Sequence, residues 1–202
     1  MFDRFKLNFK EFSGIENPVV PQKNVPFKFT ELLLECGGKP YESGLYTIHS
    51  FQNSVKWTQH LYRYFEKYKG GIISFAHDWM GRQYCVSLGA SECIYMFDPA
   101  TQEDFYFEEN LFDFHNVTLS NTKVENLASE FFQRTLEYLQ VDNVDHFSCL
   151  GFKTPLFLNG KDELNNYKLI DLEVYWDIEY QLYQQVSKLP PGTHISEINI
   201  SI

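Results

Sequence analysis

Apolar residues recur along the chain at two spacings, one typical of helices and the other of strands. The clearest helical stripe occupies positions i, i+4, i+7, i+8 and i+11, namely Trp57, Leu61, Tyr64, Phe65 and Tyr68. It predicts a helix with Ser54 as its N-cap, because a serine oxygen can accept a free amide at a helix start. Gly70 and Gly71 are expected to end this helix.

Three further segments are predicted to be helical. Residues 26–38 have a proline near the first turn and a Gly-Gly stop. Residues 122–139 begin with Thr122 and Glu125, which have the spacing of a capping box. A C-terminal stripe repeats every three to four residues before Pro190 and Pro191, which cannot continue a helix: Tyr175, Ile178, Leu182, Val186 and Leu189.

Short alternating runs between the helices predict strands. One covers residues 43–51, and four follow closely at 71–77, 82–88, 92–98 and 103–109. In the last run, Phe105 and Phe107 share one face, whereas Asp104, Tyr106 and Glu108 share the other. Four strands separated only by turns favour an antiparallel meander. The predicted fold class is therefore α+β, with an antiparallel-rich mixed sheet and helices packed on one side.

The pattern predicts one domain with two appendages. Residues 1–40 form an N-terminal lead-in and a short helix, and residues 1–26, which contain three prolines, are expected to be extended. Residues 41–189 form a single α+β domain. Residues 190–202 form a tail, in which the weak alternation of 193–202 is compatible with an edge strand.

Composition agrees with a packed protein. The chain has 202 residues, of which 44% are hydrophobic and 17% aromatic, enough large rings to fill a core. No run approaches the roughly 18 apolar residues of a membrane span, and no secretory leader is visible. Four cysteines lie at scattered positions, which predicts reduced, buried thiols in a cytoplasmic protein: Cys36, Cys85, Cys93 and Cys149.

Charge divides the chain into two unequal parts. Residues 1–82 hold 11 basic and 8 acidic residues, whereas residues 83–202 hold 6 and 19. Seven acids and no basic residue occur between Gln83 and Thr122: Glu92, Asp98, Glu103, Asp104, Glu108, Glu109 and Asp113. Such a block disfavours direct nucleic-acid binding and attracts a basic partner, although it could also be only a solvated face.

The stretch His77, Asp78, Trp79 and Arg82 contains the residue types of an acid–base or metal site. It follows a predicted strand, however, and lacks the helical setting of His-Asp phosphohydrolases. A structural turn, clamped by Asp78 and Arg82, is the favoured interpretation. The sequence shows no closely spaced zinc ligands, no phosphate-binding glycine loop and no nucleophile elbow, and a Cys–His dyad formed in space stays open.

A second acidic group occurs near the start of the C-terminal helix. Glu173 and Asp177 are four residues apart and share a face, as paired carboxylates would. Acids near a helix N-terminus also interact favourably with the helix dipole, and this interpretation is preferred.

Several segments together resemble a known family. They are "YESGLYTIHSF", "ISFAHDWMGRQY", "YMFDPATQE", "FHNVTL" and "GFKTPLFLNGKDELNNYKLIDLEVYWDIEYQL". The last is similar to the C-terminal domain of bacterial type VI secretion immunity proteins that neutralise DNase effectors. Its pattern is carried by Pro155, Leu156, Leu158, Gly160, Asn166, Asp171 and Val174, while Asn159 and Tyr167 depart from it. Residues 41–120 resemble the GAD-like region that precedes this domain, 121–189 resemble the domain itself, and the SUKH immunity proteins are a neighbouring group.

The resemblance implies a non-enzymatic immunity protein that binds a cognate toxin, expected to be a basic nuclease, and needs no cofactor or metal. The expected toxin-binding residues are Asp98, Glu103, Asp104, Tyr106, Glu108, Glu109 and Asp113, followed by Glu173, Asp177 and Glu179. Framework roles are expected for His77, Asp78, Trp79, Arg82, Pro155, Gly160 and Asp171. The alternatives are a small metal-dependent hydrolase centred on His77 and Asp78, and a protein-binding scaffold without a toxin.

Overall fold

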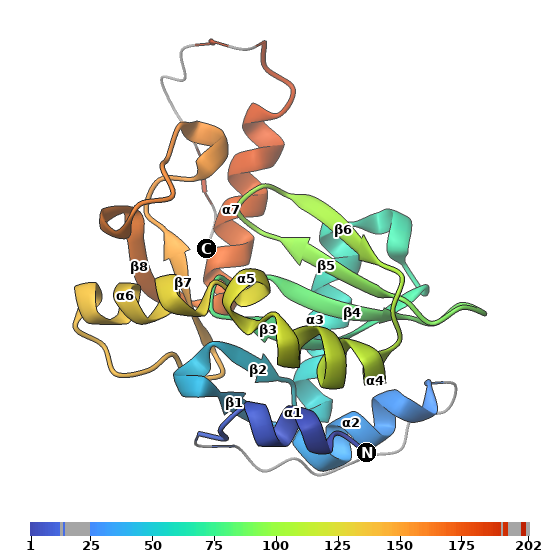
Figure 1. Cartoon of the computed structure of the whole chain (residues 1–202). Helices are drawn as coiled ribbons and strands as arrows, with labels where there is room; N and C mark the ends of the chain where they lie inside the picture. The colour runs from blue at the N-terminus through green and yellow to red at the C-terminus, as the bar shows by residue number, and fades with distance from the viewer. Residues whose placement is uncertain (13, 15–24, 191, 194–198, 201–202) are drawn as a thin grey trace.

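A six-stranded sheet forms the centre of the molecule (Figure 1). The computed structural model describes residues 1–12, 14, 25–190, 192–193 and 199–200. The strands follow one another in chain order and every neighbouring pair is antiparallel. They are β1 (Lys39–Tyr41), β2 (Tyr46–Ile48), β3 (Ile72–Asp78), β4 (Gln83–Ser87), β5 (Ile94–Asp98) and β6 (Glu103–Phe107). The predicted meander is thus confirmed, and the early strand at 43–51 is β2, which joins the same sheet.

Helices surround this sheet, so the α+β class is also confirmed. They are α1 (Asp3–Asn8), α2 (Phe27–Cys36), α3 (Phe51–Tyr64), α4 (Leu111–Asp113), a π-helical turn (Phe114–Leu119), α5 (Lys123–Leu127), α6 (Ser129–Leu139) and α7 (Leu172–Val186). A separate two-stranded sheet contains β7 (Ser148–Phe152) and β8 (Tyr167–Asp171). Short 3-10 turns occupy Glu42–Gly44, Glu66–Tyr68, Leu156–Leu158 and Leu164–Asn166.

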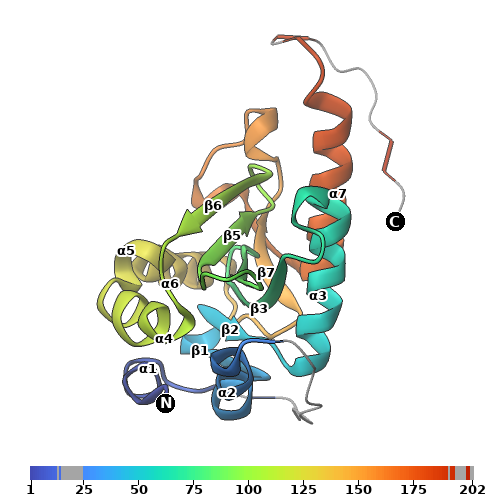
Figure 2. The ribbon, with the colours of Figure 1, turned by 90° about the vertical axis from the view of Figure 1, so that its right-hand side faces the viewer.

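Helices cover both faces of the large sheet, not one face as the sequence analysis expects (Figure 2). Helices α3 and α7 bring Trp57, Leu61 and Trp176 against Cys85 and Phe97 on one face. On the other face, α1, α2, the π-helical turn and α6 contribute to a second, larger core cluster. The reason lies in β3, all seven residues of which are buried. A strand whose side chains are buried on both sides has to be covered on both sides.

Helix α3 starts and stops earlier than predicted. The N-cap is Ser50, whose side chain accepts the amide of Asn53, and not Ser54. Ser54 is fully buried inside the helix and contacts the carbonyl of Ser74 in β3. The apolar stripe continues beyond the helical backbone because Tyr68 belongs to the following 3-10 turn.

The predicted helix at 122–139 is two helices. Ala128 separates them with a left-handed φ of 50°. The expected capping box is absent, since the hydroxyl of Thr122 donates to the carbonyl of Thr118 and caps no amide of α5. Leu127 and Phe132 are both fully buried, so the break turns two apolar stripes toward the same core.

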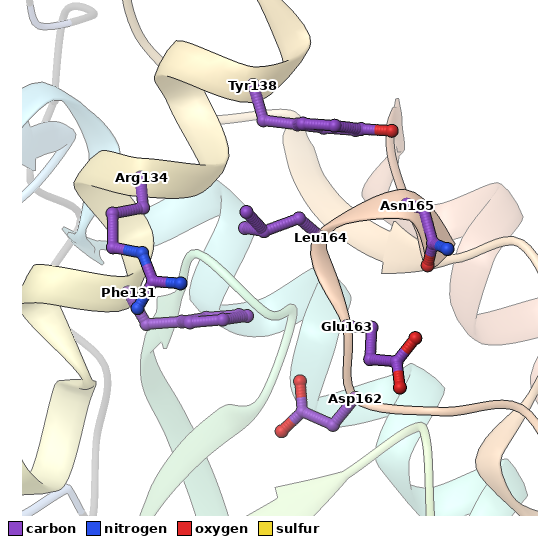
Figure 3. A pocket seen from close by; sticks show the side chains of 7 residues that line it. All are labelled: Phe131, Arg134, Tyr138, Asp162, Glu163, Leu164 and Asn165. Carbon is purple, nitrogen blue, oxygen red and sulfur yellow. The ribbon is translucent and has the colours of Figure 1, made fainter.

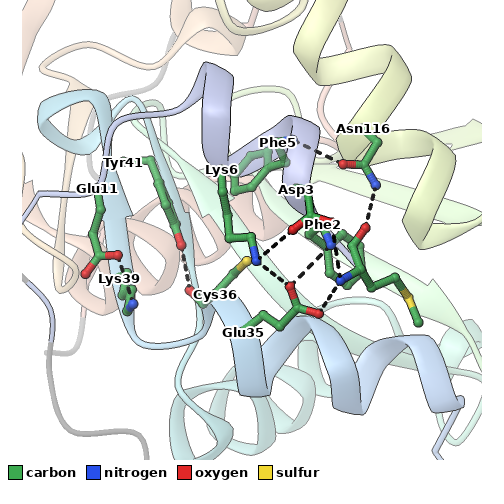
Figure 4. Close-up of polar contacts among 11 residues, drawn as sticks. Phe2, Asp3, Phe5, Lys6, Glu11, Glu35, Cys36, Lys39, Tyr41 and Asn116 are labelled. Carbon is green, nitrogen blue, oxygen red and sulfur yellow. Dashed lines mark hydrogen bonds and ion pairs between the residues drawn. The ribbon is translucent and has the colours of Figure 1, made fainter.

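The first residues form a packed helix rather than an extended lead-in. Phe2, Phe5 and Phe9 are at most 1% exposed and belong to the main core. Their spacing of i, i+3 and i+7 is a helical stripe, so the extended lead-in expected from the prolines is wrong for these residues. Figure 4 shows the polar contacts that hold this helix: Glu35 lies 2.6 Å from the amino group of Met1 and 2.7 Å from Nζ of Lys6, and Asn116 accepts the amide of Phe5.

The chain ends largely outside the described residues. Helix α7 stops at Val186, before the predicted Leu189. The expected edge strand at 193–202 falls mostly on residues that are not described, as does the proline-containing segment at 15–24. Among the described residues, no helix has the length and apolar character required to cross a bilayer.

Candidate functional site

The side chain of Asp78 is the centre of a buried turn. It has no exposed surface and accepts the amides of Met80 and Arg82, the Nε of Arg82 at 2.6 Å and the hydroxyl of Tyr84 at 3.0 Å. Gly81 allows the turn, because its φ of 82° is one that other residues rarely adopt. A carboxylate that accepts hydrogen bonds from four donors is a structural clamp with little freedom to act on a substrate.

Trp79 extends the same turn into the framework. Its indole donates to the carbonyl of Leu127 at 2.7 Å, while its own carbonyl accepts the amide of Leu150 in β7. From the other side, the indole of Trp176 donates to the carbonyl of Gly81 at 2.7 Å. The turn therefore joins the large sheet to the β7–β8 pair and to α7.

His77 lies on the opposite face of the sheet from Asp78. Its ring is 5.1 Å from that of His49, beneath α3, and is 1% exposed. Burial, together with the nearby His49 and His146, holds the pKa of His77 well below its usual value, so the ring is neutral. Because successive residues of a strand project to opposite faces, His77 and Asp78 do not form the acid–base pair that a hydrolase requires.

The part of the chain that the structure describes contains no side chains arranged for metal binding or thiol chemistry. There, no three His, Cys, Asp or Glu side chains are placed to hold a metal ion. All four cysteines are free and buried. Burial raises the pKa of Cys36 to about 11 and also raises those of Cys85 and Cys149, which makes these thiols poor nucleophiles.

Two of the predicted toxin-binding carboxylates are withdrawn from the surface, Glu179 fully and Asp98 in part. Glu179 is 1% exposed, and burial, reinforced by the charge of Asp98, raises its pKa to about 8. Asp98 accepts the amide of Ala100, and burial raises its pKa as well. Both were expected on the surface. Glu179 lies on the apolar stripe of α7 and Asp98 at the tight turn after β5, so neither offers a free carboxylate to a partner.

Glu173 and Asp177 connect two helices. Glu173 in α7 lies 2.5 Å from Nζ of Lys56 and 2.9 Å from Nε2 of His60, both in α3. Asp177 accepts the hydroxyl of Tyr64 and lies 3.9 Å from Nη2 of Arg63. These carboxylates already have partners within the chain, so they are weak candidates for contact with another protein.

The remaining predicted residues gather on and after β6, the last strand of the sheet. Glu103, Phe105, Tyr106 and Glu108 are exposed, with Phe105 at 42% and Tyr106 at 56%; we call these four side chains the β6 surface. The ring of Tyr106 rests 5.5 Å from that of Tyr95. Phe105 was not among the predicted contact residues. It lies on an edge strand where both faces reach solvent, and this position makes it a candidate contact residue.

Asp104 borders the β6 surface but is engaged. Its carboxylate binds Nζ of Lys67 at 2.7 Å and the hydroxyl of Tyr68. Partial burial raises its pKa, but these two hydrogen bonds outweigh that effect and the net shift is downward. Downstream, Glu109 accepts the hydroxyl of Thr118 at 2.6 Å, and Asp113 is exposed beside Asn110.

The framework residues of the C-terminal part shape two turns. A side chain at Gly160 would meet the carbonyl of Thr154 at 2.0 Å, so only glycine fits between Pro155 and the following loop. Asp171 caps α7 by accepting the amides of Glu173 and Val174 at 2.9 Å.

A shallow hollow of about 380 Å³ lies between α6 and the loop that precedes β8 (Figure 3). Phe131, Arg134 and Tyr138 of α6 form one wall, and the guanidinium of Arg134 lies 5.5 Å from the ring of Phe131. Asp162 and Glu163 lie on the other side, where Asp162 accepts the hydroxyl of Tyr167. This hollow is open to solvent, so it suits a side chain of another protein better than a small molecule that has to be enclosed.

Comparison with known proteins relates the chain to others by fold alone. No family model and no curated protein sequence matches it. Among solved structures, it is similar to the crystal structure of Atu4351 from Agrobacterium tumefaciens, with a TM-score of 0.62 and 14% sequence identity. The match covers 90% of this chain and 89% of that one, so the two share an architecture over nearly their whole length.

Proposed function

We propose that the chain is a non-enzymatic immunity protein that binds a secreted bacterial toxin and blocks it. The observation that carries this proposal is the β6 surface, where Glu103 and Glu108 flank the exposed rings of Phe105 and Tyr106. Exposed aromatic rings supply much of the binding energy in protein interfaces, and surrounding charges select the partner.

The charge distribution favours a basic partner. Residues 83–202 carry 6 basic and 19 acidic residues, and the two exposed glutamates of the β6 surface lie in the stretch that lacks basic residues. A nuclease has a basic cleft built for phosphate, which an acidic surface can occupy. The sequence resemblance to immunity proteins of type VI secretion supports this class of toxin, and a cytoplasmic site of action follows from it. A scaffold that binds another basic protein would use the same surface.

The proposal is tested by co-expression with the product of the neighbouring gene. If that product is a toxin, the wild-type chain restores growth and the two proteins co-purify. The double variant Glu103→Lys and Glu108→Lys is expected to slow association about tenfold and to weaken its dependence on salt, because like charges then face each other.

A matched control reverses two exposed glutamates elsewhere. Glu130→Lys and Glu137→Lys on α6 change the net charge by the same amount but lie on a different element. This control should retain rescue and an association rate within about twofold of wild type. Equal loss in both double variants, or no effect in either, would remove the β6 surface from the interface.

A further inference from the structure

The two edges of the large sheet differ in their protection. At β1, the chain covers its own edge: Glu11 forms a bridge with Tyr41, and the amide of Phe12 donates to the carbonyl of Pro40 at 3.0 Å. At the other end, β6 pairs with β5 alone, and among the described residues no segment pairs with its outer side (Figure 1).

The outer side of β6 therefore presents backbone groups ready for pairing. Its five residues pair with β5 in an unbroken antiparallel register, from Glu103 opposite Asp98 to Phe107 opposite Ile94. An inner neighbour uses only alternate amides and carbonyls of such a strand, and the others point outward. Exposed edges of this kind bind an added strand unless charge, proline or a cover prevents it.

The side chains around the outer edge of β6 determine which kind of polypeptide segment can pair with it. A second copy of the chain is disfavoured, because each copy would bring the carboxylates of Glu103, Glu108 and Glu109 to the contact, whereas the nearby Lys67 already binds Asp104. An extended segment carrying Lys or Arg gains attraction from the same carboxylates. The rings of Phe105 and Tyr106, on opposite faces of the strand, can each cover apolar side chains of the added segment.

We propose that β6 binds its partner by strand addition, accepting an extended basic segment of another protein as a seventh strand of the sheet. This inference rests on the proposed function, since it specifies how the β6 surface holds the toxin. Backbone hydrogen bonds would supply affinity without regard to sequence, and the two exposed glutamates would supply the preference for basic segments.

The test uses the full chain and a short capped peptide of alternating lysine and valine. The control peptide has the same sequence, with the backbone amides of two adjacent central residues, one lysine and one valine, N-methylated. Because adjacent amides of a strand point to opposite edges, this removes donors on both edges of the peptide and keeps the charge. Hydrogen exchange at the amides of Glu103–Phe107 is followed with each peptide at millimolar concentration. We expect the unmodified peptide to slow exchange about tenfold at the alternate amides of β6 that point away from β5, with no change in β1 and little effect from the methylated peptide.

A charge-reversed protein provides a second test of the same proposal. Glu103→Lys with Glu108→Lys should weaken binding of the lysine–valine peptide about tenfold and favour a glutamate–valine peptide instead. Strand addition is overturned if the lysine–valine peptide and its N-methylated form bind equally. It is also overturned if the lysine–valine peptide leaves the amides of β6 unprotected. If the variant loses its intact partner while the peptide leaves β6 unprotected, the proposed function stands and only this mode of binding fails.

Discussion

The imidazole rings of His49 and His77 lie 5.1 Å apart beneath α3, with both side chains at most 1% exposed. Nε2 of His49 donates to Oε1 of Gln83 at 2.9 Å, whereas Nδ1 of His77 has no hydrogen-bond partner among the described residues. Two rings this close and this deep are stable together only when both are neutral, because a positive charge would be desolvated and would repel its neighbour.

Acid should therefore destabilise the fold well above the pH at which carboxylates titrate. Burial lowers the pKa of His49 to about 4, and that of His115 to about 4, from an ordinary value near 6.5. Between pH 6.5 and about 4, these histidines are protonated in the unfolded chain but neutral in the folded chain. Their contribution to stability therefore falls as the pH is lowered through this range. At pH 5 the two histidines together cost on the order of 4 kcal/mol.

Urea unfolding at pH 7.5 and pH 5 measures this loss. His49→Gln places an amide donor near the position of Nε2 without a titrating ring, so the variant should lose less stability between the two pH values than wild type. A loss of stability between the two pH values that is as large in His49→Gln as in wild type would contradict a neutral, buried His49.

Glu179 predicts the opposite trend between pH 4.5 and pH 8. Its folded pKa of about 8 lies above the unfolded value of 4.5, so its contribution is complete below pH 4.5 and is lost as the pH rises toward 8. Each pH unit in this window costs about 1.4 kcal/mol. Glu179→Gln is therefore expected to raise the melting temperature at pH 9 more than at pH 5, whereas the exposed Glu137→Gln should change neither. A melting temperature for Glu179→Gln that shifts equally at both pH values would contradict an ionising buried carboxyl.

The sequence predicts the meander and the main helices because their apolar spacing is local. It does not predict where a carboxylate points, because that depends on which face of α7 meets the sheet. Glu173, Asp177 and Glu179 lie within seven positions, yet two bind α3 and one is buried. The break at Ala128 is similarly hidden, since alanine is the best helix former and tertiary packing alone gives it a left-handed backbone.

The turn around Asp78 should depend on its carboxylate for stability. Asp78→Ala leaves the guanidinium of Arg82, which is 15% exposed, without its buried partner, together with two unsatisfied amides. Loss of one member of a buried pair costs about 3–5 kcal/mol. The double variant Asp78→Ala with Arg82→Met should recover part of that loss, because the orphaned charge is gone. Chemical denaturation of the four proteins gives the coupling energy, and simple additivity of the two substitutions would contradict the clamp.

The packed position of α1 gives a prediction with an internal control on the same helix. Phe5 is fully buried, with its ring 4.5 Å from that of Phe9 and 5.0 Å from that of Tyr41, whereas Leu7 is 86% exposed. Phe5→Ala should cost about 3–5 kcal/mol, because it removes a large ring from the main core and leaves a cavity. Leu7→Ala should change stability by no more than about 0.5 kcal/mol. Urea titration of both variants measures the difference. A small loss for Phe5→Ala would mean that the first residues are an appendage, as the prolines alone suggest, and that the core of the protein is complete without them.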